Sequence, residues 1–159
     1  MSKICCFTGS RDLAGLDCSK ISLNLEKVLA DLIENEGYTD FRAGGARGFD
    51  TLAALSVFEL KTRHPHVKLH LILPCKTQNR YFSRKEDQFY KMILERADTV
   101  TYIQEEYGNG VMFRRNRALV DGADMCVALL RKSSGGTYMT VKYAQRQGVE
   151  VKNLMNLLK

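Results

Sequence analysis

Short apolar runs alternate along the chain with longer stretches that have helical spacing. The first apolar run, Lys3–Thr8, ends at Gly9, which is typical of a buried strand. In Ser19–Glu36 apolar residues recur on one helix face, and Gly37 stands where a C-cap is expected. Further strands are predicted at Thr39–Ala43, Val67–Leu73, Asp98–Ile103, Asp124–Leu130 and Val149–Leu154. Further helices are predicted at Phe49–Arg63, Arg84–Arg96, Phe113–Asp121 and Thr137–Gln147, with loops at Lys76–Ser83 and Gln104–Gly110.

This alternation predicts the fold class: a three-layer α/β domain with a mostly parallel sheet of five to six strands. In such sheets ligands bind at the carboxyl ends of the strands, near the point where the strand order reverses. The glycine-rich and arginine-rich loops each follow a predicted strand or precede a helix, so we expect them to share one edge of the sheet. With 159 residues, two prolines and no Ser/Gly-rich linker, residues 1–159 are expected to form one domain.

Charge and cysteine content narrow the function classes. The net charge of +6 favours anionic ligands, from nucleotides to nucleic acid, but does not separate them. The positive charge is spread along the chain without a basic tail, which slightly favours a local phosphate site over a surface that tracks DNA. The five cysteines include no C-x-x-C pair, so they are interpreted as reduced and mostly buried. Neither a signal peptide nor a membrane span is recognised, and a cytoplasmic protein is expected.

Four segments carry the candidate chemistry: Thr8–Arg11, Phe41–Thr51, Met112–Arg117 and Ser134–Thr137. Glycines let a ligand approach the backbone closely, and amide groups at a helix start attract anions. Arginine forks bind phosphate in bidentate fashion. Neither G-x-G-x-x-G nor G-x-x-x-x-G-K-[ST] is present, which argues against an NAD fingerprint and a P-loop. Each segment also has a plainer interpretation as a turn, a helix cap or a solvated basic face.

Some side chains keep two interpretations. Asp50 either complements the dipole of the helix that starts beside it, or accepts a ribose hydroxyl or acts as a general base. The loop aromatics Tyr81, Phe82 and Tyr107 either stack on a base or pack their loops onto the sheet. The histidines and cysteines show no metal-ligand spacing, so no metal site is predicted.

In combination, CCFTGSR, AGGARGFDTLAA, RRNRALVD and SGGTYMTVKYA resemble the SLOG superfamily of Rossmann-like nucleotide-binding proteins. The chain looks most like the stand-alone bacterial members of the DUF1273 (YpsA-like) group, from Lys3 to about Leu154. GGARGFDTLAA is also similar to the glycine loop of the DprA DNA-processing proteins, Arg115–Arg117 to their downstream arginine motif, and SGGT to the glycine signature of the LOG phosphoribohydrolases.

The resemblance implies a Rossmann-like fold and a glycine-lined site for a nucleotide or a nucleotide-derived ligand. The residues at the matching positions are Gly9, Ser10, Arg11, Gly44, Gly45, Ala46, Arg47, Gly48, Asp50, Arg115, Asn116, Gly135, Gly136 and Thr137. LOG enzymes read P-G-G-x-G-T-x-x-E where this chain reads SGGTYMTVK, without the second spacing glycine and the glutamate. That departure argues against LOG-type cleavage. DprA proteins carry further domains that 159 residues cannot hold, which argues against their recombinase-loading role.

The leading hypothesis is therefore a ligand-binding protein, acting as a sensor or regulator of a nucleotide-like small molecule. Glycine loops would hold the phosphates, Arg47 and Arg115 would neutralise them, and Asn116 or Asp50 would contact the sugar or base. The first alternative is a hydrolase of a nucleotide or nucleotide-sugar with Asp50 as candidate base. The second is a binder of single-stranded nucleic acid. No cofactor other than such a ligand and no membrane partner are expected, and a homo-oligomer is compatible with the domain type.

Overall fold

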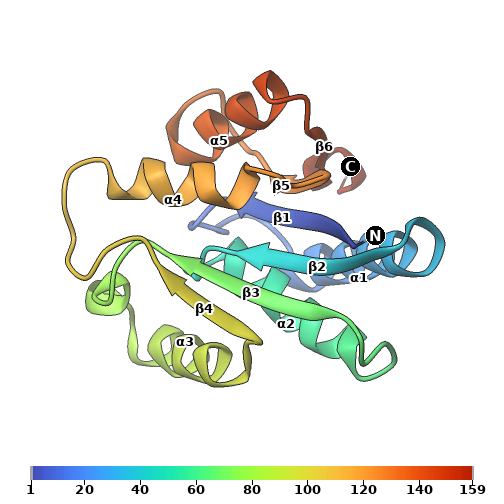
Figure 1. The fold of residues 1–159 in the computed structure, drawn as a ribbon, viewed down its shortest axis with the longest axis horizontal. Helices are drawn as coiled ribbons and strands as arrows, with labels where there is room; N and C mark the ends of the chain where they lie inside the picture. Colours follow the sequence, from blue (N-terminus) through green and yellow to red (C-terminus); the bar gives the residue numbers. More distant parts are fainter. Residues whose placement is uncertain (1, 159) are drawn as a thin grey trace.

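A six-stranded sheet in the order β4-β3-β2-β1-β5-β6 forms the centre of the protein (Figure 1). The computed structural model describes residues 2–158. Its strands are β1 (Lys3–Gly9), β2 (Tyr38–Ala43), β3 (Lys68–Leu73), β4 (Thr99–Tyr102), β5 (Met125–Leu129) and β6 (Glu150–Asn153). Every neighbouring pair of strands is parallel. The predicted α/β class is confirmed, and the sheet is wholly rather than mostly parallel.

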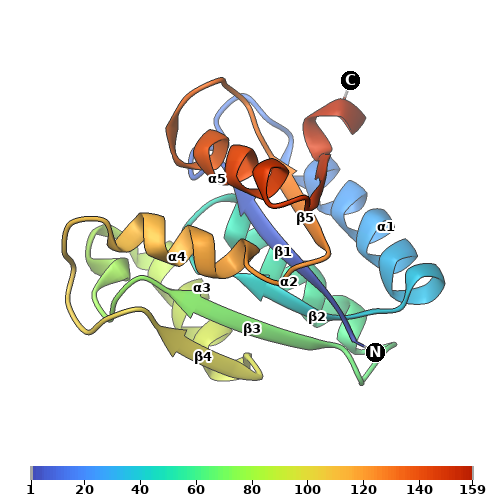
Figure 2. The same cartoon turned by 45° about the horizontal axis from the view of Figure 1, so that its top comes forward.

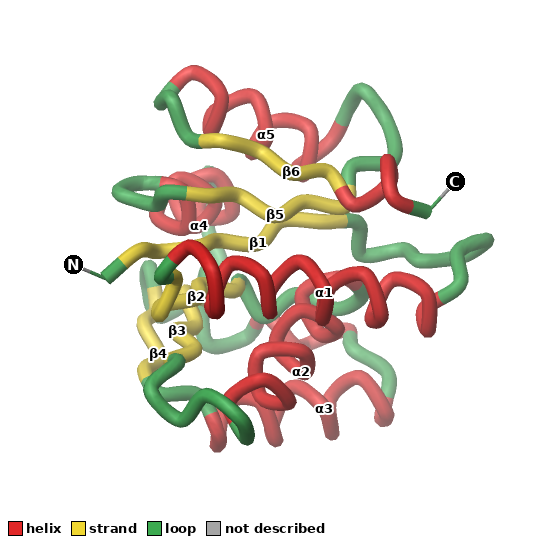
Figure 3. The backbone as a smooth tube through the Cα atoms, turned by 90° about the vertical axis from the view of Figure 1, so that its right-hand side faces the viewer, coloured by secondary structure: helices red, strands yellow, loops and turns green. Residues whose placement is uncertain are grey.

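Helices cover both faces of this sheet. On one face lie α1 (Cys18–Glu36), α2 (Phe49–Lys61) and α3 (Arg84–Arg96), as Figure 3 shows. On the other face α4 (Val111–Val120) and α5 (Gly135–Arg146) lie side by side (Figure 2). Two short 3₁₀ helices, η1 (Gln78–Tyr81) and η2 (Leu154–Leu157), complete the structure. Among residues 2–158, the helices are all too short or too polar to cross a membrane.

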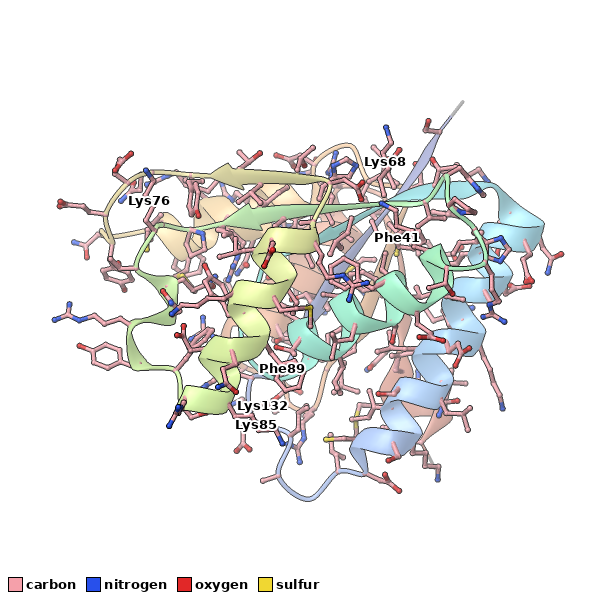
Figure 4. All side chains as sticks on the ribbon, turned by 90° about the horizontal axis from the view of Figure 1, so that it is seen from below. Phe41, Lys68, Lys76, Lys85, Phe89 and Lys132 are labelled. Atoms are coloured by element: carbon pink, nitrogen blue, oxygen red, sulfur yellow. The ribbon has the colours of Figure 1, made fainter. Side chains whose placement is uncertain are left out.

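The central strands are buried on both faces because their side chains alternate between two cores. Cys5 and Phe7 of β1 join the larger core under α1–α3, where the Phe7 ring lies 6.0 Å from that of Phe41. Figure 4 shows Phe41 on the helix side of β2. Cys6 faces the opposite way and packs with Leu119 of α4 in the smaller core. Continuous apolar runs such as Met125–Leu129 follow from this double burial.

Helix boundaries follow local capping chemistry. The carboxylate of Asp17 accepts hydrogen bonds from the amides of Ser19 and Lys20, so α1 begins one residue earlier than predicted. Gly37 ends α1 in the left-handed conformation, as its position in the sequence indicates. Ser83 and Glu86 form a capping box at the start of α3.

Most predicted bounds differ from the structure by one or two residues: α5, for example, begins at Gly135 rather than Thr137, and α2 ends at Lys61 rather than Arg63. Three further differences have a clear local cause. The helix predicted to begin at Phe113 begins at Val111 instead. Gly110 directly precedes it, and its left-handed conformation (φ 77°) marks the end of the preceding loop. The loop predicted over Lys76–Ser83 contains the 3₁₀ helix η1. The last strand, predicted to reach Leu154, ends at Asn153, because the Asn153 side chain accepts a hydrogen bond from the Met155 amide and starts η2. These differences arise from short-range hydrogen bonds that hydrophobic periodicity does not report.

The strand order creates a switch point between β1 and β5. From β1 the chain builds outward through β2, β3 and β4, and it then returns to build β5 and β6 on the other side of β1. The connections that leave the carboxyl ends of β1 and β5 therefore diverge to opposite faces, and a crevice opens between them.

Arg42 of β2 fixes the far end of α4, the helix that carries Arg115 and Asn116. Its Nη1 donates to the carbonyl oxygens of Ala118, Leu119 and Asp121, at 3.3, 3.0 and 2.6 Å. These carbonyls belong to the last turn of α4, where helical partners are missing. A cationic donor there also complements the helix dipole.

Replacing Arg42 with methionine is expected to lower the free energy of unfolding by about 1.5–3 kcal/mol, because charge-assisted hydrogen bonds to the end of α4 are lost. Urea denaturation measures this change. The exposed Arg146→Met variant on α5 is the matched control and should change stability by about 0.5 kcal/mol or less. Equal losses in the two variants would show that Arg42 does not hold α4.

Candidate functional site

Two adjoining clefts lie along the carboxyl edge of the sheet. The first cleft, about 390 Å³, sits at the switch point and is lined by Phe7, Thr8, Gly9, Ser10, Arg11, Asp12, Ala46, Asp50, Arg115, Asn116, Leu119, Leu129, Leu130, Lys132, Ser134, Gly135, Gly136 and Thr137. The second cleft, about 480 Å³, is lined by Arg11, Ala46, Arg47, Pro74, Cys75, Thr77, Gln78, Arg80, Tyr81, Phe82, Tyr107 and Met112.

The loop after β1 forms one wall of the first cleft and is held at both ends. The Ser10 amide donates to the carbonyl of Leu129 at 3.3 Å, which continues the β1–β5 pairing into the loop. Further on, the Arg131 guanidinium donates to the carbonyls of Asp12 and Ala14 at 2.7 and 2.8 Å. The arginine of this clamp was not singled out from the sequence, where it appears as one more basic residue after a strand.

Two glycines bring this loop and the start of α2 into contact. A Cβ on Gly48 would lie 2.4 Å from the carbonyl oxygen of Arg11, and Gly48 has a φ of 78°. A Cβ on Gly9 would lie 2.3 Å from the Phe49 ring. The Phe49 amide then donates to the Ser10 carbonyl at 3.1 Å. Both glycines are thus required for packing, and Gly48 does not line the first cleft.

Gly44 and Gly45 are also enclosed by protein. A Cβ on Gly44 would lie 2.7 Å from Nη1 of Arg115 and 3.0 Å from Oδ2 of Asp50. A Cβ on Gly45, whose φ is 69°, would lie 2.5 Å from Leu73. Neither residue lines the first cleft. Surrounding side chains therefore leave no room for a Cβ at Gly44 or Gly45. Ala46, the next residue of the turn, lines both clefts.

Asp50 and Arg115 form the buried polar centre beneath the first cleft, with exposures of 7% and 4%. Nη1 of Arg115 donates to the Gly44 carbonyl and, at 3.1 Å, to Oε1 of Gln78, while Nε donates to Asn116 at 2.9 Å. Oδ2 of Asp50 accepts the Ala46 amide at 3.1 Å. Nη2 of Arg115 takes part in none of the hydrogen bonds found within residues 2–158, and the side chain lines the cleft.

Burial and charge act against each other in this pair. Burial raises the pKa of Asp50, and the neighbouring Arg115 charge and the Ala46 amide partly oppose that rise. Burial likewise lowers the pKa of Arg115, and the Asp50 charge opposes it. The pair therefore depends on mutual proximity, since either charge alone would be strongly destabilised in this position.

The start of α5 forms the opposite wall. In the part of the chain that the structure describes, no side chain caps the first amides of α5, and Ser134 at the N-cap is extended. A Cβ on Gly136 would meet no atom within 4 Å, so the backbone is open there. Free amides at a helix start, next to an open backbone, form a natural seat for an anion.

The structure brings most of the expected site residues together. Those that line the first cleft are Gly9, Ser10, Arg11, Ala46, Asp50, Arg115, Asn116, Gly135, Gly136 and Thr137. Arg47 lies elsewhere: it lines the second cleft, and its guanidinium lies 3.8 Å from the carboxylate of Glu86. Lys132 lines the first cleft and was not predicted. Within residues 2–158 no cluster of His, Cys, Asp and Glu side chains could hold a metal ion.

Replacing Gly48 with alanine should lower the free energy of unfolding by about 2–4 kcal/mol, because its backbone (φ 78°, ψ −122°) disfavours a residue with a Cβ and the close contact adds to that strain. Gly148→Ala is the control for a positive φ alone: its φ is 76°, but within residues 2–158 a Cβ there would meet no atom within 4 Å. We expect a loss of about 1 kcal/mol from the control. Urea denaturation compares the two, and equal losses would contradict the close contact with the loop after β1.

Asp50 is expected to titrate above its ordinary pKa of 3.8, and Arg115→Met should raise the Asp50 pKa further by removing an opposing charge. Carboxyl carbon NMR titration measures both values. Because the folded-state pKa is raised, this group's contribution to stability is complete below pH 3.8 and declines as the pH rises through the folded-state pKa.

Asp87 provides an internal control in the same spectra, since hydrogen bonds from Asn79 and Lys91 lower the pKa of its carboxyl group. An Asp50 pKa at or below that of Asp87 would contradict the burial and pairing described above.

Comparison with known proteins places this chain in a family. A family model described as the YspA SLOG family (YpsA) matches residues 11–157. The uncharacterized SPbeta prophage-derived protein YoqJ of Bacillus subtilis is 30% identical over 139 residues, which cover 80% of this chain and 81% of that protein.

Solved structures show the same fold. The DNA processing protein A (DprA) of Streptococcus pneumoniae superposes with a TM-score of 0.67 at 17% identity, over 95% of this chain and 49% of that one. DprA of Helicobacter pylori, whose structure is described for its single-stranded DNA binding mode, superposes with a TM-score of 0.65 at 16% identity, over 94% of this chain and 63% of that one. This chain thus spans about half to two-thirds of each DprA chain. The predicted resemblance is confirmed, and the chain belongs to the YpsA family of SLOG proteins.

Proposed function

We propose that this protein binds a nucleotide or nucleotide-derived ligand with its phosphate in the first cleft, and that it acts as a sensor or regulator. The observation that carries the proposal is the open, uncapped start of α5 at the switch point, faced by cationic side chains. Gly135, Gly136 and Thr137 offer backbone amides there, and Arg11 and Lys132 line the same cleft. Helix amides together with cations provide the charge and the donors that a phosphate needs.

The charge balance of the first cleft supports an anionic ligand. Asp50 and Arg115 carry opposite charges, and each charge opposes the effect of burial on the pKa of the other group. The Asp12 carboxylate accepts the amide of Ala14 at 2.9 Å within its own loop. The side chains of Arg11 and Lys132 form no ion pair with any residue in 2–158, and both remain available to a ligand.

Binding fits the site better than hydrolysis. Lys142 stands at the position of the glutamate in the LOG signature, so the start of α5 offers no acid to the cleft. The remaining candidate base, Asp50, is buried and accepts the Ala46 amide. An acid held in that way is suited to fixing Arg115 and the glycine turn in position.

Single-stranded nucleic acid is the second candidate ligand. The DprA of Helicobacter pylori is described as binding single-stranded DNA, and the second cleft here combines exposed aromatic and arginine side chains. Stacking platforms in cationic grooves are typical of such binding.

A thermal-shift panel of AMP, ADP, ADP-ribose and cyclic dinucleotides tests the proposal. A ligand at a hundred times its Kd adds about 2.7 kcal/mol to the free energy of unfolding. Lys132→Met should weaken the binding of a stabilising nucleotide at least about tenfold, because a charge-assisted contact contributes roughly 1.5–3 kcal/mol. Lys27→Met makes the same charge change at an exposed position of α1, outside both clefts. It is the matched control and should leave affinity unchanged.

Three results would redirect the proposal. If no nucleotide stabilises the protein, or Lys132→Met and Lys27→Met bind alike, the first cleft is not the phosphate site. Conversion of a bound nucleotide to products, lost in Asp50→Asn, would establish a hydrolase. Oligonucleotide affinity that falls steeply with salt and exceeds that for every mononucleotide would favour the second candidate.

A further inference from the structure

The second cleft has a different chemistry from the first. Within residues 2–158 its lining has no acidic side chain, and it includes Arg47 and Arg80 together with the aromatic rings of Tyr81 and Tyr107. Tyr81 is 82% exposed and Tyr107 is 69% exposed. Large aromatic side chains that remain exposed around a concave site are typical of surfaces that bind a planar ligand.

The loop that carries Tyr81 is held firmly. The neighbouring Phe82 ring packs edge-on against Tyr90 of α3, with ring centroids 5.4 Å apart. On the other side, the Asn79 amide group donates to the Asp87 carboxylate at 2.6 Å. Phe82 therefore packs the loop onto the core, while Tyr81 projects into solvent beside it. The packing interpretation from the sequence thus applies to Phe82 and not to Tyr81.

The loop that carries Tyr107 is tied to the same framework. The Lys76 amide donates to the Glu105 carbonyl at 3.1 Å, and the Gln104 amide donates to the Pro74 carbonyl at 3.2 Å. Lys76 and Glu105 also form an ion pair at 3.0 Å. Figure 4 shows Lys76 just beyond the carboxyl end of β3, opposite to Lys68 at its start. The loops after β3 and β4 therefore present their tyrosines from one connected platform.

Arginine adds to this platform. The Arg80 guanidinium lies 5.4 Å from the centre of the Tyr81 ring, within the range of a cation–π contact. Guanidinium groups stack on planar rings and donate to the oxygen and nitrogen acceptors on their edges. Tyrosine and arginine together match the flat face and the polar edge of a nucleobase.

The two clefts adjoin, because Arg11 and Ala46 line both. We propose that the second cleft is the base-recognition subsite for the nucleotide whose phosphate lies in the first cleft, with the base stacked on Tyr81 and Tyr107. This inference rests on the proposed function and extends it. The ligand is then a molecule with a phosphate at one end and a planar base at the other, and the Arg11 and Ala46 segment lies under the sugar that joins them.

Calorimetric titration with AMP, GMP and ribose 5-phosphate tests the inference, because ribose 5-phosphate keeps the phosphate and sugar and lacks the base. The wild type should bind at least one mononucleotide tenfold or more tightly than ribose 5-phosphate, as expected for base stacking. The double variant Tyr81→Ala/Tyr107→Ala should bind all three compounds with similar affinity. Because both tyrosines are exposed, thermal unfolding of the free variant should match the wild type.

Tyr138→Ala, which changes a tyrosine that lines neither cleft, is the matched control and should keep the preference for the mononucleotide. Equal wild-type affinity for the mononucleotides and ribose 5-phosphate would overturn the base subsite and leave the phosphate site in place. A preference that survives in the double variant would do the same. Absence of binding by all three compounds would overturn the proposed function, and this inference with it.

Discussion

The buried contact of Arg115 with the glycine-rich turn is the interaction on which the carboxyl edge of this protein depends. Arg115 comes from α4 on one face of the sheet, and it reaches the Gly44 carbonyl after β2 and Gln78 after β3. Asp50 at the start of α2, on the other face, supplies the compensating charge. One guanidinium thus joins elements from both layers. Removing either partner would leave a buried charge uncompensated, which is usually strongly destabilising.

This arrangement separates residues that build the first cleft from residues that remain open within it. Gly44, Gly45 and Gly48 let chain segments approach one another, whereas Gly136 remains open. Arg115 is largely occupied by protein, whereas Lys132 lines the same cleft and forms no ion pair within residues 2–158. Asp50 and Arg115 are held in fixed positions beneath the first cleft, and the side chain of Lys132 lies in its lining. Groups that are ordered before binding lose less entropy when a ligand binds.

The fold class and the meeting of the loops could be predicted from the sequence, because a parallel sheet follows from periodicity and places every strand end on one edge. The roles within the site could not. Arg115 and Gly44 are 71 residues apart, and Arg42 reaches Leu119 across 77 residues. Such contacts leave no local pattern. Arg47 and Arg115 look alike in sequence, and only packing places one at the second cleft and buries the other beneath the first.

We propose that the crevice at the β1–β5 switch point receives the phosphate of a nucleotide. Amide chemical shifts recorded by NMR during titration with ADP test it directly, because they report on backbone groups at the ligand. We expect the largest changes at Ser10, Arg11 and the amides of 135–137, where the open start of α5 faces the loop after β1. Changes confined to the outer faces of α1 and α2, with none at these amides, would contradict it.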